Sequence, residues 1–394
     1  MKILILSFHF HPDLSAGSFR SSALVEALQK KLPAGSHIEV MTTLPNRYSS
    51  FSVEAPKKEE RPSLTIHRIA LPSHQSGMLD QSKSFLSYAR QVNKLVKNKD
   101  YDLIYASSSR LMTATLGSWI ARRKNLPLYL DIRDIFVDTI NDVLSKKLVW
   151  LMKPIFSLIE SWTINSAKKV NLVSAGFLPY FQDRYPIKEF SLFTNGIDRE
   201  FIQAQPIDNV VSKRAIPEVV YAGNMGEGQG LHHIIPALAK HFDGRLKFKL
   251  LGDGGRRKQL VQANENAGCR NIELLAPVAR EELISIYKDA DVLFLHLNDY
   301  DAFKKVLPSK IFEYAALGKP IWAGVGGFAA NFIQDNINNS AVFSPCNINE
   351  AIESFDGLQL VTQPRTGFIE RFSREKIMEL LAEDLVNIGE ENNT

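Results

Sequence analysis

The chain has 394 residues, of which 45% are apolar and 23% are charged. This composition is typical of a globular protein and excludes a wholly disordered, collagenous or coiled-coil chain, while the length favours two or three domains. The two cysteines are too few for a disulfide framework. The first residues lack the long apolar stretch of a secretory signal, and no window reaches the roughly 18 apolar residues of a membrane span. We therefore expect a cytoplasmic protein, held peripherally at most on the cytoplasmic face of a membrane.

The net charge of +4 is divided unevenly along the chain. Residues 1–200 hold 27 Lys and Arg against 18 Asp and Glu, whereas residues 201–394 hold 20 against 25. This division indicates two domains with different tasks. It reflects either unevenly charged solvated surfaces or a basic half that meets an anionic partner such as a membrane. Basic and aromatic residues do not alternate as they do in base-stacking surfaces, so we expect no nucleic-acid partner.

Strands and helices alternate in the first half of the chain. Short apolar runs predict strands at residues 2–7, 36–41, 64–70, 103–106, 128–132 and 169–173. Amphipathic patterns predict helices at residues 18–31, 80–97, 112–124 and 145–167. The last of these helices is expected to be interrupted at Pro154. Alternation of this kind favours βαβ units around a parallel sheet.

The pattern restarts near residue 205, where prolines and polar residues indicate a connector. Strands are then predicted at residues 219–222, 248–251, 272–274, 292–297 and 320–323. Helices are predicted at residues 231–240, 255–267, 281–288, 309–317, 329–335 and 373–387. We therefore predict an α/β fold of two doubly wound, Rossmann-like domains, residues 1–205 and 206–372, facing each other across a cleft. Residues 373–394 would form a helix that crosses back to the first domain. Ligands bind such sheets outside the carboxyl ends of the strands.

A glycine-rich turn follows the strand predicted at residues 219–222. Gly223, Asn224, Gly226 and Gln229 lie between this strand and the next helix. Glycines let a ligand approach the backbone closely, and the N–H groups at a helix N-terminus bind anions. The spacing matches neither a dinucleotide fingerprint nor a P-loop. The turn predicts either an anion site or a tight connection from strand to helix.

A second motif surrounds the start of the helix predicted at residues 309–317. Ser309 is a favourable N-cap residue, and Lys310 and Glu313 lie on the same side of the first turn. A diphosphate at this helix end would be neutralised by Lys310, while Glu313 would accept hydrogen bonds from ribose hydroxyls. The alternative is a capping arrangement in which Lys310 and Glu313 form a surface pair.

The first half supplies the remaining candidates. His11 and Gly17 lie in the loop after the first strand, where Gly17 is a candidate phosphate contact. Arg133 and Asp134 end the strand predicted at residues 128–132, where Arg133 would hold an anion and Asp134 would orient or deprotonate a hydroxyl. An Arg–Asp pair that caps the following helix is the alternative. The histidines of the first loop lack a third ligand, so we expect no metal ion.

Three blocks of the second half together resemble glycosyltransferase family 4. They are Gly223-Asn224-x-Gly226-x-x-Gln229-Gly230-Leu231, Leu251-Gly252-Asp253-Gly254, and the block that runs from Pro308-Ser309-Lys310 to Gly318-Lys319-Pro320. Within the family, the chain is most similar to bacterial surface-polysaccharide enzymes of the N-acetylfucosaminyltransferase type. The resemblance implies a GT-B fold and a retaining hexosyltransferase of the kind that builds O-antigen, lipopolysaccharide or capsule. It would use no cofactor or metal and would take a nucleotide sugar, such as a UDP-N-acetyl sugar, as donor and a glycan or lipid-linked acceptor.

The resemblance also assigns roles, with the donor on the second domain and the acceptor on the first. The donor contacts would be Gly17, Gly223, Asn224, Gly226, Gln229, Ser309, Lys310 and Glu313. The acceptor contacts would be His11, Arg133 and Asp134, and the catalytic residues Lys310, Asn224, Asp134 and Arg133. The chain departs from the family's pattern at four positions. Lys305 replaces the first of two glutamates, Asn224 and Gln229 replace an arginine and a lysine, and Arg133 replaces a histidine.

The sequence shows no carboxylate pair suited to double displacement, which favours substitution on the front face of the sugar. Backbone N–H groups at residues 223–226 and 309–310, together with Lys310, would then stabilise the departing diphosphate. Two other functions remain open. One is a non-hydrolysing nucleotide-sugar epimerase, and the other is a catalytically silent partner that binds a nucleotide sugar, which Lys305 favours. Residues 146–153 mix basic and apolar side chains and predict either a packed helix with exposed lysines or a peripheral membrane contact.

Overall fold

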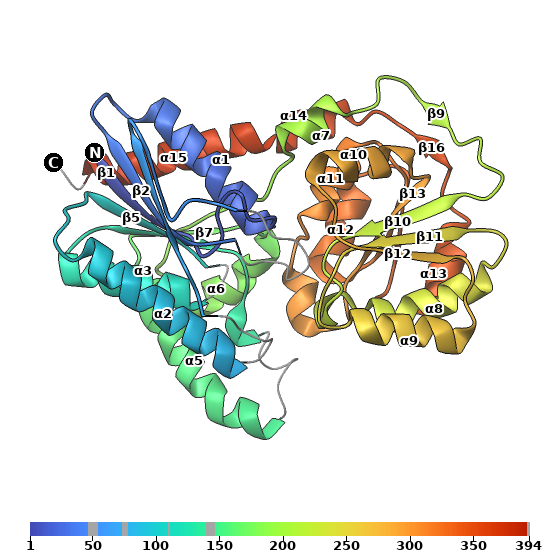
Figure 1. The fold of residues 1–394 in the computed structure, drawn as a ribbon, viewed down its shortest axis with the longest axis horizontal. Coiled ribbons are helices and arrows are strands. Elements are labelled where there is room, and N and C mark those ends of the chain that lie inside the picture. Colours follow the sequence, from blue (N-terminus) through green and yellow to red (C-terminus); the bar gives the residue numbers. More distant parts are fainter. Residues whose placement is uncertain (46–53, 73–77, 109–110, 139–145, 392–394) are drawn as a thin grey trace. The chain divides into compact units, whose positions relative to one another are not determined.

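The computed structural model describes the chain except for residues 46–53, 73–77, 109–110, 139–145 and 392–394. The chain forms two units, of which unit 1 comprises Met1–Asn195 with Arg374–Thr394 and unit 2 comprises Gly196–Ser373 (Figure 1). The units divide at Asn195, whereas the sequence predicted a boundary near residue 205. Helix α7 (Arg199–Gln203) explains this difference, because its Phe201 is fully buried in the core of unit 2.

Unit 1 is built on an eight-stranded sheet with the order β3-β4-β2-β1-β5-β6-β7-β8. Every pair of neighbours is parallel except β3 and β4. The strands are β1 (Lys2–Leu6), β2 (His37–Thr43), β3 (Lys58–Arg61), β4 (Leu64–Ile69), β5 (Leu103–Ser107), β6 (Leu128–Ile132), β7 (Lys169–Leu172) and β8 (Phe190–Ser191). The buried, mostly apolar runs of β1, β5 and β6 are those expected of strands that are covered on both faces.

The helices of unit 1 lie on both faces of this sheet (Figure 1). They include α1 (Ala16–Lys31), α2 (Met78–Val96), α3 (Leu111–Lys124), α5 (Lys146–Ser166), α6 (Leu178–Arg184) and α15 (Arg374–Glu391). Helix α15 packs on α1, with Met378 and Leu381 buried in the same core as Leu24. The C-terminal helix therefore returns to unit 1, as predicted. Helix α5 runs through Pro154 without the interruption that the sequence predicted.

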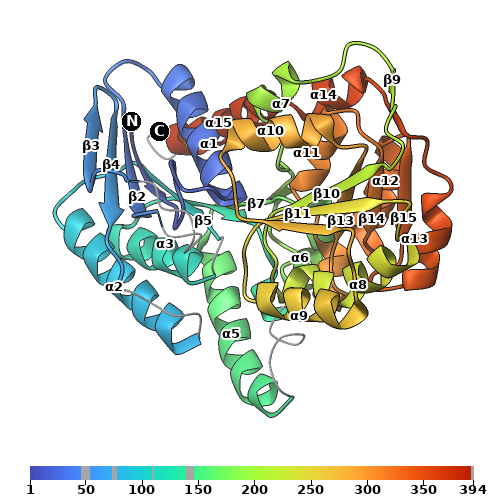
Figure 2. The same cartoon turned by 45° about the vertical axis from the view of Figure 1, so that its right-hand side comes forward.

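Unit 2 is built on a parallel six-stranded sheet with the order β12-β11-β10-β13-β14-β15 (Figure 2). Its strands are β10 (Glu218–Ala222), β11 (Lys247–Leu251), β12 (Ile272–Leu275), β13 (Val292–His296), β14 (Ile321–Gly324) and β15 (Ser340–Phe343). A separate antiparallel pair joins β9 (Val210–Val211) to β16 (Val361–Thr362). The helices are α7, α8 (Leu231–His241), α9 (Arg257–Ala267), α10 (Arg280–Asp289), α11 (Lys310–Ala316), α12 (Gly327–Asn336), α13 (Ile348–Phe355) and α14 (Thr366–Phe372).

Successive side chains of β10 enter two different cores, one on each face of the sheet. Val220 and Ala222 lie in the core beneath α11, whereas Val219 and Tyr221 lie in the core beneath α8. This alternation places Tyr221 under the turn that follows the strand. The two sheets, one parallel and one parallel except for β3, confirm the predicted fold class together with the returning helix, while the facing of the two units across a cleft stays a prediction.

The two ends of unit 2 lie side by side. The N–H of Ile197 donates to the carbonyl oxygen of Phe372 at 2.8 Å, and Ile197 forms a parallel bridge with Ser373. The chain therefore enters and leaves unit 2 at one place. Within the described residues, none of the helices is both long and apolar enough to cross a membrane.

Candidate functional site

The glycine-rich turn after β10 is locked against the turn after β11. The N–H of Gly223 donates to the carbonyl oxygen of Leu251 at 2.8 Å, and the N–H of Met225 donates to that of Asp253 at 2.9 Å. Gly252 has a φ of +141°, and a Cβ atom there would overlap the carbonyl oxygen of Gly223. The two turns thus approach at backbone distance, which requires glycine at this position.

The amide side chains of Asn224 and Gln229 stabilise the turn through hydrogen bonds. Asn224 Nδ2 donates to Gln229 Oε1 at 2.7 Å, and the N–H of Gly226 donates to the same oxygen at 3.3 Å. The N–H groups of Gly223, Met225 and Gly226 are therefore all used inside the unit. The sequence analysis assigned these groups to a departing diphosphate. In this structure they donate to the neighbouring turn and to Gln229, and their contact with a diphosphate stays a prediction.

Lys310, the first residue of α11, brings a positive charge to this turn. Its Nζ atom lies 4.5 Å from the centre of the Tyr221 ring and 3.3 Å from Tyr221 Oη. A Cβ atom on Gly223 would overlap Lys310 Nζ, so the ammonium group lies directly against the glycine turn. Tyr221 is fully buried and donates to the carbonyl oxygen of Asn224 at 2.5 Å. The structure therefore brings together the two motifs of the second half that the sequence singled out.

Ser309 and Glu313, the other two residues of the second motif, precede and follow Lys310 in the sequence. Ser309 occupies the predicted N-cap position, but its backbone is already helical, with φ −61° and ψ −28°, and its side chain makes no capping hydrogen bond. Glu313 lies one turn further along α11 and is partly buried. Burial acts to lower the pKa of Arg280, but the carboxylates of Asp198, Glu313 and Glu200 outweigh it and raise that pKa. Glu313 therefore also contributes to the acidic surroundings of Arg280.

His296, the last residue of β13, holds the glycine-rich turn from the other side. Its Nδ1 lies 2.7 Å from the carbonyl oxygen of Gln229, and its Nε2 accepts the N–H of Cys346 at 3.0 Å. A neutral ring with its proton on Nδ1 satisfies both partners. The side chain is fully buried, and this burial lowers the pKa of His296 to about 4. The sequence analysis did not select His296, because its partners are 67 and 50 residues away.

The Asp-Tyr-Asp triplet at residues 299–301 is engaged within unit 2. Tyr300 Oη donates to Glu227 Oε1 at 2.7 Å, and Lys304 Nζ donates to Asp301 Oδ1 at 2.7 Å. Among the described residues, no three His, Cys, Asp or Glu side chains gather in a way that would hold a metal ion.

In unit 1, Arg133 follows the carboxyl end of β6. Its N–H donates to Ser108 Oγ at 3.1 Å, and its buried Nη1 atom has no hydrogen-bond partner among the described residues. Burial lowers the pKa of Arg133, although Asp131 acts against this. The next residue, Asp134, is exposed. A guanidinium group whose Nη1 atom is buried without an acceptor is suited to an anionic group of a ligand.

A buried ion pair supports this end of the sheet. Arg20 of α1 contacts both carboxylate oxygens of Asp131 at 2.8 Å, and Asn171 Nδ2 donates to Asp131 Oδ1 at 2.7 Å. Arg20 also donates to the carbonyl oxygens of Phe193 and Thr194 at 2.8 and 2.7 Å. The pair is fully buried and was not selected from the sequence. It fixes α1, β6, β7 and the last residues before unit 2 to one another.

The first loop of unit 1 holds the last two candidates. Strand β1 ends at Leu6, and His9 and His11 lie in the loop that follows it. His9 is buried and lies 2.7 Å from Asp13, whereas His11 is exposed. Gly17 is buried in the first turn of α1. This helix begins at residue 16, two residues before the start that the sequence predicted.

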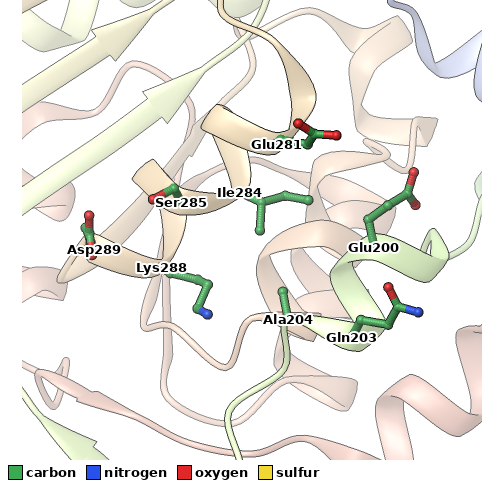
Figure 3. Close-up of a pocket in the computed structure, with 8 residues that line it drawn as sticks. All are labelled: Glu200, Gln203, Ala204, Glu281, Ile284, Ser285, Lys288 and Asp289. Atoms are coloured by element: carbon green, nitrogen blue, oxygen red, sulfur yellow. The ribbon is translucent and has the colours of Figure 1, made fainter.

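A separate pocket of about 430 Å³ lies between α7 and α10 of unit 2 (Figure 3). Figure 3 shows Ile284 and Lys288 of α10 directed toward Ala204 at the end of α7. None of the candidate residues lines this pocket. The residues that carry the candidate site therefore lie around the glycine turn and α11 rather than here.

Comparisons with known proteins find a family that part of unit 2 resembles. Residues 209–371 match the family described as Glycosyl transferases group 1. A curated relative, the putative colanic acid biosynthesis glycosyl transferase WcaI of Escherichia coli, is 32% identical over 100 residues. That match covers 25% of this chain and 24% of the relative, so it spans about a quarter of each.

Three solved structures are similar over nearly the whole chain. WaaG, a glycosyltransferase involved in lipopolysaccharide biosynthesis, is 15% identical with a TM-score of 0.65, covering 99% of this chain and 98% of that one. HepE of Anabaena, in complex with UDP and glucose, is 16% identical with a TM-score of 0.66, covering 98% and 99%. The trehalose-6-phosphate synthase OtsA is 11% identical with a TM-score of 0.68, also covering 98% and 99%. At these identities, the likeness establishes the GT-B fold alone.

Proposed function

We propose that the whole chain is a retaining glycosyltransferase, which the match of residues 209–371 to the group 1 glycosyl transferases supports. It transfers a hexosyl group from a nucleotide diphosphate sugar to a glycan or lipid-linked acceptor in the synthesis of a bacterial surface polysaccharide. The observation that carries this proposal is the Lys310 ammonium group against the Gly223 turn. The similar structures of HepE with UDP and glucose and of WaaG support the choice of donor and pathway. We propose a UDP-N-acetyl sugar as donor, as in the N-acetylfucosaminyltransferase type.

The reaction we propose occurs on one face of the sugar. The acceptor hydroxyl bonds to the anomeric carbon from the side on which the diphosphate leaves, and its proton passes to the departing phosphate oxygen. The bond between the anomeric carbon and that oxygen breaks, so the products are the glycoside and the nucleoside diphosphate. The protein's task is to stabilise the negative charge that develops on the leaving group. Because three N–H groups of the glycine turn are already used, Lys310 carries most of this task.

The remaining donor contacts follow from the positions of the side chains. Glu313, on the same face of α11, accepts hydrogen bonds from the ribose hydroxyls. Asn224 and Gln229, which hold each other, give the turn its shape and present its glycines, Gly223 and Gly226, to the diphosphate. Ser309 and the buried Gly17 complete the phosphate contacts in this proposal.

Unit 1 receives the acceptor in this proposal. Arg133, with its buried and unpartnered Nη1 atom, holds an anionic group such as the phosphate of a lipid-linked acceptor. The exposed Asp134 orients the acceptor hydroxyl, and His11, also exposed, contacts the sugar beyond it. Lys305, which is partly buried at the end of a short 3-10 helix, stands where the family has a glutamate for the transferred sugar. We infer that this lysine changes the choice of sugar.

The decisive experiment is the turnover of Lys310→Ala with purified protein. Thermal-shift screening with UDP and GDP first identifies the nucleotide, because a ligand that binds only the folded state raises the melting temperature. Loss of one preorganised donor typically costs about 10²–10³ in rate, and we expect a loss of about that size for Lys310→Ala. Lys240→Ala removes an exposed lysine of α8 and serves as the control. Equal turnover in both variants and in the native protein would exclude the proposed role of Lys310.

The ribose contact has its own test. Glu313→Ala should weaken binding of the free nucleoside diphosphate by about 10- to 100-fold in calorimetry, since a hydrogen bond to a charged group contributes about 1.5–3 kcal/mol. Unchanged affinity removes Glu313 from the ribose. Incubating the donor without acceptor separates the alternatives. An epimerised donor indicates an epimerase, and tight binding without turnover on any lipid-linked acceptor indicates a silent partner.

A further inference from the structure

Helix α5 of unit 1 has two halves with different surroundings. Its C-terminal half packs on α3, where Thr163 is buried and its hydroxyl lies 3.1 Å from Thr115 Oγ1. In its N-terminal half, none of the residues 147–159 is buried. Figures 1 and 2 both show this half extending past the end of α3. The N-terminal half therefore lacks cover from the described parts of its own unit.

This uncovered half presents large apolar side chains. Leu148, Leu151, Ile155 and Leu158 follow one another at intervals of three and four residues, which places them in one stripe along the helix. Leu151 and Leu158 are 57% and 72% exposed, and Trp150 beside the stripe is 81% exposed. Large apolar side chains scattered singly over a surface need no explanation, but a contiguous stripe of them indicates a binding surface.

The stripe points away from the core of the unit. At 100° per residue, Leu151, Ile155 and Leu158 lie on the side of the helix opposite Glu160 and Ile164, which are buried. Packing against α3 therefore does not account for the apolar side chains of the stripe. The sequence left two interpretations open for residues 146–153, and the exposed or partly exposed side chains of residues 147–153 do not favour the packed helix.

The charges around the stripe are of one sign. Residues 146–159 contain three lysines and no Asp or Glu. The first acidic residue of the helix, Glu160, is turned into the unit, where it accepts hydrogen bonds from the hydroxyls of Tyr180 and Tyr185 at 2.9 and 3.2 Å. A surface that combines apolar side chains, a tryptophan and lysines complements the interface of an anionic bilayer.

We propose that the N-terminal half of α5 docks unit 1 on a bilayer of anionic lipids. Leu151, Ile155 and Leu158 enter the boundary between headgroups and acyl chains, Trp150 lies at headgroup depth, and Lys147 contacts the lipid phosphates. A second copy of the chain is a poorer occupant, because residues 146–159 carry only positive charge in both copies. The proposal concerns the binding of lipid by unit 1 and does not depend on the reaction proposed for unit 2.

Co-sedimentation of the full chain with lipid vesicles tests the proposal. We expect the native protein to sediment with phosphatidylcholine vesicles that contain about a third of phosphatidylglycerol, and far less with phosphatidylcholine alone or at high salt. The double variant Leu151→Ser/Leu158→Ser should lose more than about tenfold in vesicle affinity, because it removes buried apolar area. Lys147→Glu should sharply reduce the preference for anionic vesicles. The matched control is Leu380→Ser, since Leu380 of α15 is 56% exposed and lies outside the stripe.

Three results would overturn the proposal. The first is that the native protein fails to sediment with anionic vesicles at low salt, and the second is that Leu380→Ser loses as much binding as the double variant. The third is a dimer in light scattering that the double variant dissociates, because the stripe would then be an interface between copies. Circular dichroism of each variant confirms folding, and nucleoside diphosphate binding by the same samples reports on unit 2 separately.

Discussion

Replacing His296 by phenylalanine should change how the stability of unit 2 depends on pH. Burial holds the pKa of His296 at about 4 in the folded protein, below its ordinary value of 6.5. Between these two values the unfolded chain binds a proton that the folded chain refuses, so the free energy of unfolding falls as the pH falls. From about pH 7 to about pH 5, this one group should cost the native protein about 2 kcal/mol.

The phenylalanine variant lacks this dependence but carries a cost at every pH. It leaves the carbonyl oxygen of Gln229 and the N–H of Cys346 without their partner, which costs about 1–3 kcal/mol for each group. The variant should therefore be clearly less stable than the native protein at about pH 7. The difference should shrink by about 2 kcal/mol at about pH 5, because only the native protein loses stability to His296.

Urea unfolding of unit 2 can be followed through Trp322. This residue is fully buried in the same unit, whereas Trp119, Trp150 and Trp162 belong to unit 1. Incorporated fluorotryptophan gives Trp322 its own resonance, so the two units need not unfold together for the analysis to hold. His241→Asn, which alters an exposed histidine of α8, is the control. A difference between native protein and phenylalanine variant that stays constant from about pH 7 to about pH 5 would refute the reasoning.

Two further predictions concern the packing of each unit. Gly252→Ala should destabilise unit 2 by more than about 1 kcal/mol and abolish nucleotide binding in calorimetry, because its Cβ atom would displace Gly223. Gly255→Ala meets nothing within 4 Å and should leave both quantities close to those of the native protein; equal loss in the two variants would contradict the account of the turns. Asp131→Asn should lower the unfolding free energy of unit 1 by about 3–5 kcal/mol in urea titration, since it leaves a buried arginine without its counter-charge. Glu375→Gln breaks an exposed pair and should change little, and a comparable loss there would count against the buried pair.

The alternation of strands and helices was predictable because each element carries its own local pattern. The exceptions are short. Strand β15 has only four residues, and its place is fixed by pairing with β14, which no local pattern reveals. Helix α13 does carry a local signal, because Asn347 accepts the N–H of Glu350 at 3.2 Å in a capping arrangement that the sequence displays. The sequence analysis did not predict this eight-residue helix, which lies beyond the last strand that it predicted.

The candidate site was predictable only in its local parts. The glycine turn and the start of α11 are short motifs, and the structure brings Lys310 to Gly223 as their shared chemistry suggests. His296 and the pair of Arg20 with Asp131 act through partners between 50 and 111 residues away, which sequence spacing does not reveal. Three N–H groups of the glycine turn donate to the neighbouring turn or to Gln229, and these hydrogen bonds were likewise not predictable from the turn alone. The sequence therefore predicted which short motifs belong to the candidate site. It did not predict which of their backbone N–H groups and side chains are engaged within the protein.

The bridge between Ile197 and Ser373 makes unit 2 a cassette within the chain. Because both of its ends emerge at one point, it can be excised or exchanged for a related unit without stretching either junction. The flanking segments are likewise free to be rejoined by a short peptide. Replacing this single internal stretch would therefore exchange the whole of unit 2 while leaving unit 1 unchanged.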